Sequence, residues 1–597
     1  MKPQGAQNRL TALSPLKKYR FWVLFAPFLK VFECVCELIV PIMVALLIKR
    51  GLTLDPEYPD LYQNEVFIFG VGGTLLGLAL LGFLATMVTQ FLAAKISSEY
   101  AYDLKETLFG KIHSLSVGQL DSFGRNKALN LITSDALFMQ NGVQMFMRLL
   151  ARSPFLIIGS IIASFLVNPL AGLIVLIALL ACSLTILVVF LATPKRYAEL
   201  QKQLDALSSL GEDGILGARV IRAFGKEEKQ SSAFHEASGR YRSLALVVAR
   251  INAFINPLTF AFVSLAIVFI LYVGGYQGTP GNSLGVGDIV ALVSYLTQSL
   301  AALVMFTRLV TSLSKAVASK KRIDQFLALE SDLVDGPLDE EPSLKKGDLL
   351  FCLEHVHVNF GGEEDVLSDI NLQIRSGEHI GIIGGTGSGK SSMVQLIPRL
   401  YDVRKGSVKV GGVDVRDYDL EVLRSSVAMV LQKNVLFSGT IKENIRWGKE
   451  DATDEEIVRA CRLAQADEFI AGFPDGYDTY IEQGGTNVSG GQRQRLCIAR
   501  ALIAKPKILI LDDSTSAVDT HTESLIRAGF ASDIPDTTIF IIAQRISSVK
   551  DADRIIVLDD GKVSGIGTHE ELMASNAIYQ EVYESQNKGG DFDEPGK

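Results

Sequence analysis

The segment 380–391 reads IGIIGGTGSGKS, an apolar run followed by a glycine-rich turn, a lysine and a serine. The turn fits the spacing GxxxxGK[ST], in which glycines let backbone N–H groups curl around phosphate oxygens. Lys390 is expected to reach the outer phosphates of a nucleoside triphosphate, and Ser391 to offer its hydroxyl to Mg²⁺. The candidate phosphate-binding residues are Gly385, Thr386, Gly387, Ser388, Gly389, Lys390, Ser391 and Ser392.

A second apolar run, 508–511, ends in Asp512 and Asp513. An acidic residue at a strand end beside a phosphate-binding loop holds the shell of Mg²⁺, so Asp512 is expected to act as a metal ligand together with Ser391. Asp513 then stands where a group that orients or activates an attacking water is expected. Both motifs must be positioned by the strands of one sheet, which predicts an α/β P-loop domain over 350–586.

Hydrophobic residues make up 48% of the 597 residues, which is high for a soluble protein, and the excess lies in long apolar runs before this domain. About 20 apolar residues suffice for a helix to cross a bilayer. Six segments qualify, and they predict an α-helical six-span membrane domain over 21–325, with a polar segment 1–20 before it, a linker 326–349 after it and a polar, disordered tail 587–597. The predicted spans are 21–48, 66–94, 143–167, 170–192, 253–274 and 286–307.

Two connections between the spans, 95–142 and 193–252, are long and show helical periodicity, which predicts helical extensions beyond the membrane. Each contains a turn that could contact another domain, near 117–125 and 209–219. Lys and Arg gather in segment 1–20 and in both long connections. The positive-inside rule therefore places these parts and the C-terminal half in the cytoplasm. The net charge of −8 gives no reason to expect nucleic-acid binding.

Several polar residues lie within the predicted spans, where they are expensive and usually functional. Glu33 and Glu37 are four residues apart on one helix face, so they bind cations if they face an aqueous cavity, or pair between helices if they do not. The other candidate substrate contacts are Gln90, Gln144, Arg148, Asn252 and Asn256.

The segment NVSGGQRQRLCIARAL lies about twenty residues before Asp512. Its residues Ser489, Gly490, Gly491 and Gln492 resemble the signature of ATP-binding-cassette (ABC) proteins. The resemblance implies that Phe360 stacks on adenine, that Gln432 contacts Mg²⁺ and the coupling helices, and that Asp519 lies in the loop that crosses to a second nucleotide domain. Nearly the whole chain resembles an exporter-type half-transporter, in which the turns 117–125 and 209–219 correspond to the coupling helices.

The same resemblance implies ATP and Mg²⁺ as cofactors, a bacterial cell membrane as location and a dimer as the active unit. Two cassettes pair head to tail, so that each ATP lies between the P-loop of one chain and the signature of the other. The partners are then a second half-transporter chain, membrane lipids and an amphiphilic small-molecule substrate.

Two catalytic positions depart from the family. Asp513 stands where a hydrolytic member has Glu, and the Asp side chain is one methylene shorter than that of Glu. A general base must come within about 3 Å of the proton that it takes, so the shorter carboxylate is expected to slow hydrolysis. Gln544 stands where His is expected, and an amide cannot become cationic. With an intact signature, the chain resembles the degenerate-site subunit of heterodimeric multidrug exporters. The alternative is a homodimer in which Asp513 still positions water.

The resemblance leaves three functions open. The first is export of drugs or lipid-like amphiphiles, which the apolar spans favour. The second keeps the exporter fold and imports siderophores or cofactors. The third is an ATP-gated sensor or channel without a transport cycle, against which the intact signature argues.

Overall fold

The computed structural model describes residues 10–52, 65–275, 284–340, 345–360, 364–513 and 518–588. The chain forms two compact units, one made of Met1–Ile112 and Asn126–Leu329 and the other of His113–Arg125 and Glu330–Lys597. Most of the predicted tail 587–597, and the first half of the loop that leads to Asp519, lie outside the described residues.

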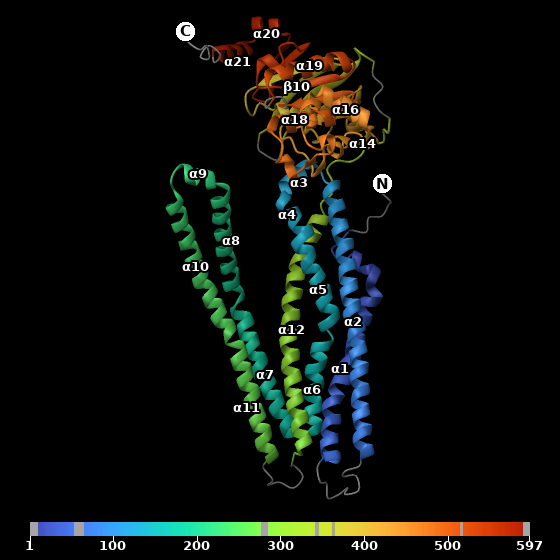
Figure 1. Ribbon diagram of the computed structural model, residues 1–597, viewed down its shortest axis with the longest axis vertical. Coiled ribbons are helices and arrows are strands. Elements are labelled where there is room, and N and C mark those ends of the chain that lie inside the picture. Colours follow the sequence, from blue (N-terminus) through green and yellow to red (C-terminus); the bar gives the residue numbers. More distant parts are fainter. Residues whose placement is uncertain are drawn as a thin grey trace. The chain divides into compact units, whose positions relative to one another are not determined.

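Within the described residues, six helical segments are long and apolar enough to cross a membrane, as the sequence predicted (Figure 1). Four of the spans extend well past their apolar cores, which confirms the predicted helical extensions. The third span is broken into several helices. The helices of this unit are η1 (Pro15–Tyr19), α1 (Arg20–Leu47), η2 (Ile48–Leu52), α2 (Glu65–Ser114), α4 (Arg125–Asn130), η4 (Leu131–Asp135), α5 (Ala136–Leu149), α6 (Arg152–Val167), α7 (Pro169–Ala192), α8 (Pro194–Leu216), α9 (Ala218–Ala223), α10 (Glu227–Ala253), α11 (Ile255–Gly275) and α12 (Val286–Leu327).

The turn between α6 and α7 is as tight as the sequence predicts. Asn168 caps α7, because its side-chain oxygen accepts hydrogen bonds from the backbone N–H of Leu170 at 2.9 Å and of Ala171 at 3.1 Å. Pro169 occupies the first helical position, where a missing N–H costs nothing.

The arm formed by α7 to α11 corrects one prediction. Helix α8 packs along α10, and α7 along α11, with the short α9 at the tip (Figure 1). The expected turn at 209–219 is misplaced, because α8 continues to Leu216 and the tip helix is α9. Gly211 and Gly214 lie inside α8. The chain turns instead between Gly217 and Gly225, and Gly225 has the positive φ of 57° that favours glycine.

The other predicted turn, at 117–125, forms helix α3 (Val117–Phe123). Ser116 and Gln119 make a reciprocal capping box at its start. This helix belongs to the nucleotide-binding unit: the Gln119 amide donates a hydrogen bond to the carbonyl of Glu330 at 2.7 Å. A Cβ added at Gly118 would lie 3.3 Å from the Tyr401 ring.

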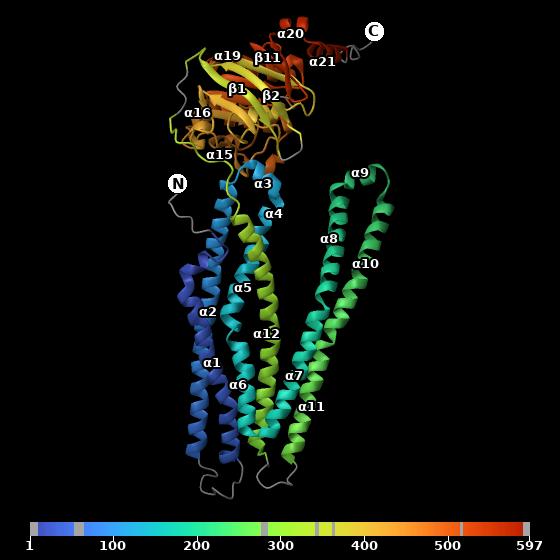
Figure 2. The same cartoon turned by 180° about the vertical axis from the view of Figure 1, so that it is seen from behind.

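Two large sheets and a two-stranded one, β7 (Gly439–Thr440) with β8 (Tyr480–Ile481), lie in this unit together with its helices. The six-stranded sheet has the order β12-β11-β3-β10-β9-β6, parallel except for the edge strand β12, and the other four-stranded sheet, β2-β1-β4-β5, is antiparallel; Figure 2 shows its β1 and β2. The strands of the two sheets are β1 (Leu349–Val358), β2 (Leu367–Arg375), β3 (His379–Gly384), β4 (Lys405–Val410), β5 (Val413–Asp414), β6 (Val427–Val430), β9 (Ile508–Asp512), β10 (Thr538–Ile542), β11 (Arg554–Asp559) and β12 (Lys562–Gly567).

The central strands are buried on both faces, as expected of parallel strands. Along β9, Ile508 and Ile510 belong to one hydrophobic cluster, and Leu509 and Leu511 to the other. The alternating side chains therefore anchor β9 between two cores and fix the position of Asp512 at its end.

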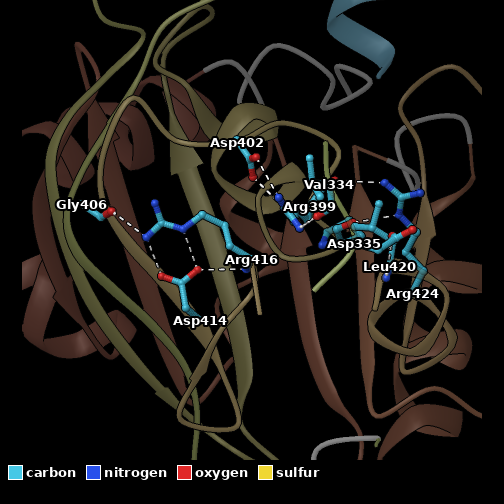
Figure 3. Close-up of polar contacts among 10 residues, drawn as sticks. Val334, Asp335, Arg399, Asp402, Gly406, Asp414, Arg416, Leu420 and Arg424 are labelled. Carbon is cyan, nitrogen blue, oxygen red and sulfur yellow. Dashed lines mark hydrogen bonds and ion pairs between the residues drawn. The ribbon is translucent and has the colours of Figure 1, made fainter. Parts of the chain in front are cut away.

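The predicted linker 326–349 is a docked segment over much of its length. Its residues 334–338, which we call the strap, run along 417–419: Gly336 N–H donates to the Tyr418 carbonyl at 2.8 Å, and Leu338 N–H to the Asp417 carbonyl at 3.0 Å. The buried Arg399 donates to the Val334 carbonyl at 2.9 Å and pairs with Asp402 (Figure 3). The strap is thus fixed to the nucleotide-binding unit by its backbone.

Candidate nucleotide-binding site

The carboxyl ends of four strands (β3, β6, β9 and β10) converge on one cavity of about 530 Å³. Ligands of open parallel sheets bind at this edge. The sequence-predicted residues that line the cavity are Phe360, Gly385, Thr386, Gly387, Gly389, Lys390, Ser391, Ser392, Gln432, Asp512, Asp513 and Gln544. Among the predicted P-loop residues, Ser388 does not line it; this side chain is buried behind the loop.

The loop after β3 requires its glycines. Gly387 and Gly389 have φ angles of 85° and 92°, and a Cβ at Gly389 would lie 2.6 Å from the Leu367 side chain. The Lys390 ammonium donates to the carbonyls of Gly384 at 2.9 Å and Gly385 at 2.7 Å. Burial lowers the pKa of Lys390, while Asp512 and Asp513 act in the opposite sense. The arrangement holds a cation at the mouth of a backbone cradle suited to phosphate.

Asp512 fits the role of a metal ligand. It is 2% exposed, and the Ser391 hydroxyl donates to its Oδ1 at 2.8 Å. Burial raises the pKa of Asp512, and the Ser391 hydrogen bond opposes that rise. Mg²⁺ is a hard cation that binds oxygen ligands, and the Asp512 carboxylate and the Ser391 hydroxyl offer two such oxygens side by side. Gln432, exposed just beyond β6, lines the same cavity.

The two positions that the sequence predicts to depart from the family contact each other. Gln544, two residues beyond β10, donates from Nε2 to Oδ2 of Asp513 at 2.6 Å. Asp513 has a φ of 48°, in the left-handed region that Asp tolerates better than most residues. The carboxylate in the base position is therefore engaged by an amide from the neighbouring strand.

Helix α21 (Ala577–Lys588) fixes the segment that carries Gln544, a contact that sequence reasoning missed. Gln586 donates to the Gln544 carbonyl at 2.7 Å and accepts from the Ile546 N–H at 2.9 Å. Nothing in the spacing of residues 42 apart in the chain indicates this pairing. One side chain thus clamps the backbone on both sides of Arg545.

The predicted adenine-stacking residue, Phe360, is 47% exposed at the cavity wall. Its ring packs edge-on against Tyr401, with centroids 4.7 Å apart. One face of an aromatic ring at the edge of a nucleotide cavity remains available for stacking on a base.

The signature residues lie away from this cavity. Ser489 caps α18 (Gly490–Ile503) in a reciprocal box with Gln492, which leaves Ser489 and Gly490 exposed at the helix N-terminus. Asp519 caps α19 (Thr520–Asp533) by accepting from the Thr522 N–H at 2.9 Å. Neither Ser489 nor Asp519 lines the P-loop cavity of the same chain.

In the membrane unit, the structure decides between the two alternatives for Glu33 and Glu37 in favour of pairing between helices. Arg152 donates to Glu33 at 2.7 Å and to Glu37 at 3.0 Å, and Lys30 also pairs with Glu33. Glu33 and Glu37 therefore join α1 to α6 and are not free to bind cations. Sequence reasoning missed both partners, although Lys30 stands three residues before Glu33, on the same helix face.

Comparison with known proteins agrees with this architecture. Residues 23–303 match the ABC transporter transmembrane region and residues 367–516 the ABC transporter domain. The uncharacterized ABC transporter ATP-binding protein YfiB of Bacillus subtilis is 36% identical, over 96% of this chain and 98% of its own length. An ATP-dependent lipid A-core flippase of Desulfotalea psychrophila is 31% identical, over 82% of this chain and 85% of its own.

A solved bacterial Atm1-family ABC exporter with ATP bound has the same fold, with a TM-score of 0.77 and 23% identity, covering 95% of this chain and 99% of that one. The chain belongs to the ABC transporter family. It is an exporter-type half-transporter, with six membrane-spanning helices fused to an ATPase domain that couples ATP hydrolysis to transport, and such half-transporters act as dimers.

Proposed function

We propose that this chain is the degenerate-site subunit of a heterodimeric exporter of drugs or lipid-like amphiphiles. Its own P-loop site mainly binds ATP and Mg²⁺, through Lys390, Ser391 and Asp512. Its signature, led by Ser489, completes the hydrolytic site on ATP held by the partner. The membrane is the bacterial cell membrane, with the N-terminus and ATPase domain in the cytoplasm.

The observation that carries the proposal is the hydrogen bond between Gln544 and Asp513. A general base must face the proton that it takes. The Asp513 carboxylate is one methylene shorter than that of Glu, and its Oδ2 accepts a hydrogen bond from the Gln544 amide. Unlike the histidine expected at position 544, an amide cannot become positively charged or relay a proton. The phosphate-binding loop with Lys390, and Ser391 bonded to Asp512, lie in the same cavity, which supports binding over hydrolysis.

ATP then acts as a ligand of the closed pair of ATPase domains. A ligand shifts such an equilibrium only by its difference in affinity for the two states. A site that hydrolyses slowly keeps the domains engaged between cycles, while hydrolysis at the other site resets the transporter.

The proposal is tested by purifying the tagged chain from its native membrane and sequencing what co-purifies. We expect a second half-transporter with Glu and His at the two positions. In that complex, Asp513→Asn should leave steady-state ATP turnover nearly unchanged, whereas Ser489→Ala should lower it roughly tenfold or more.

Thr453→Ala is the matched control for Ser489→Ala, because Thr453 also caps a helix in a reciprocal box and lies outside the P-loop cavity. The homodimer reading would be correct if only this chain is recovered, turns over ATP rapidly and stops on Asp513→Asn. Uptake of substrate into inside-out vesicles supports export over import, and ATPase that rises with substrate excludes a gated channel.

A further inference from the structure

A second cavity, of about 370 Å³, lies in the membrane unit. Helices α1, α2, α5, α6 and α12 all contribute to its wall. Its polar lining includes Gln90, Arg148, Arg152, Ser153 and Gln298, and its apolar lining includes leucine, alanine and methionine side chains. The cavity therefore combines charge with apolar surface, as an amphiphile does.

The charges around the cavity do not cancel. Lys30 and Glu33 are 1% and 6% exposed and pair with each other, and Arg152 bridges Glu33 and Glu37. Three cations (Lys30, Arg148 and Arg152) thus face two carboxylates, which leaves one positive charge.

Arg148 carries that excess. Among the residues that the structure describes, it makes no hydrogen bond or ion pair, and it is partly buried near the end of α5. A partly buried cation beside the apolar part of a membrane span is unfavourable without a counter-ion. An anion in the cavity would remove that cost.

Two further polar atoms lack partners within the described structure. The side-chain Oε1 of Gln298 and the Oγ of Ser153 are buried without a hydrogen bond, and both residues line the cavity. Buried polar groups usually find a partner, so both atoms are available to a ligand. The Ser153 hydroxyl can donate to an anionic oxygen, whereas Gln298 Oε1 can only accept, so Gln298 donates to an anion from its Nε2 amide.

We propose that this cavity binds the anionic headgroup, a phosphate or a carboxylate, of an amphiphile. Arg148 supplies the charge, and Ser153 and Gln298 supply hydrogen bonds. The inference rests on the proposed function, because it names the substrate class of the same transporter. Arg148 lies about 8 Å along the third predicted span from its cytoplasmic end, at the depth of headgroups and upper chains of that leaflet.

The test measures binding to the detergent-purified, assembled transporter, with four short-chain probes. These are dioctanoyl phosphatidic acid, decanoate, dioctanoyl phosphatidylcholine and decyltrimethylammonium. Wild type should bind the two anions more tightly than the zwitterion or the cation. Arg148→Gln should weaken binding of both anions by roughly tenfold or more and leave the other two unchanged.

Arg148→Lys should retain most of the preference for anions. Arg250→Gln, the same charge change at an exposed position on α10 outside the cavity, should change nothing. If Arg148→Gln fails to fold, Gln298→Glu serves instead, because it adds a neutralising carboxylate to the same cavity and should abolish the preference.

The proposal is overturned if wild type binds phosphatidylcholine as tightly as phosphatidic acid and decanoate, or if neither variant changes anion affinity. If Arg148→Gln loses binding to phosphatidic acid alone, the site is specific for phosphates. If it loses binding to phosphatidic acid and decanoate, the site takes phosphates and carboxylates alike. If amphiphiles of other charge still bind and stimulate ATP turnover, the proposed function stands while this inference falls. If no amphiphile binds, both fall.

Discussion

The amide of Gln544 donates to the carboxylate of Asp513 at 2.6 Å, so the two departures from the hydrolytic pattern form one unit. Substitutions in direct contact are expected to be non-additive. In Asp513→Glu alone, the longer carboxylate still lies beside the Gln544 amide. In Gln544→His alone, the carboxylate of Asp513 is still one methylene too short. We expect either single change to alter hydrolysis at this site little, and the double change to raise it by roughly tenfold or more.

The measurement is single-turnover hydrolysis of labelled nucleotide trapped at this site in the assembled complex. Ser391→Ala in the double variant is the control, because it should remove the gain by perturbing the metal-ligand set. An additive response of the two single changes would contradict the idea that they act as one unit.

Gln586 should order the segment that carries Gln544. Gln586→Ala removes two hydrogen bonds to that backbone, each contributing about 0.5–1.5 kcal/mol. Hydrogen exchange at the Ile546 amide should therefore speed up by roughly tenfold, while ATP affinity changes little. Gln580→Ala on the same helix, which removes a bond to the Met573 carbonyl, should not affect this amide. Unchanged exchange at Ile546 in Gln586→Ala would show that the clamp does not hold in solution.

Gly336→Ala should release the strap. The added Cβ would lie 2.1 Å from the Asp417 carbonyl carbon, a backbone atom that cannot step aside. We expect a loss of about 1–3 kcal/mol from overpacking, and transport that falls more than ATP binding does. Gly529→Ala, whose Cβ meets nothing closer than 3.6 Å, is the control. Transport at wild-type rate in Gly336→Ala would refute a mechanical role for the strap.

Arg152→Met should destabilise the membrane unit, because it leaves the buried carboxylate of Glu33 with Lys30 as its remaining ion-pair partner in the described structure. Because Lys30 remains paired with Glu33, the loss should be smaller than the about 3–5 kcal/mol that follows when a buried charge is left unpaired. Thermal unfolding in detergent should show the loss, and Glu33→Gln added to Arg152→Met should recover part of it. A variant as stable as wild type would mean that the pair contributes nothing.

The local parts of this molecule could be predicted from its sequence. A run of apolar residues must become a helix in a bilayer, and a glycine-rich turn before Lys390 and Ser391 permits few conformations, so spans and P-loop were both predictable. The turn of the arm was predicted at 209–219 and lies at 217–225, because α8 stays helical to Leu216 while it packs along α10.

Contacts between side chains far apart in the sequence could not be predicted. Arg152 reaches Glu33 across 119 residues, and Gln586 reaches Gln544 across 42. No periodicity encodes such contacts, since they depend on how helices and strands meet in three dimensions. The sequence consequently predicted Glu37, Gln90 and Arg148 of the cavity wall as separate candidates, without Arg152, which neutralises the carboxylates.

Because the strap is docked, the length of the chain between α12 and the strap should determine how tightly ATP hydrolysis is coupled to transport. Helix α12 ends at Leu327 and the strap begins at Val334, so the short stretch 328–333 joins them, and the described structure holds it at the Glu330 carbonyl, which accepts from Gln119. Each residue inserted there adds up to about 3.5 Å of slack. We expect a few inserted glycines and serines to weaken the coupling between the ATPase domain and the membrane helices. ATP turnover should then continue while transport falls, and the difference between the two should grow with the added length.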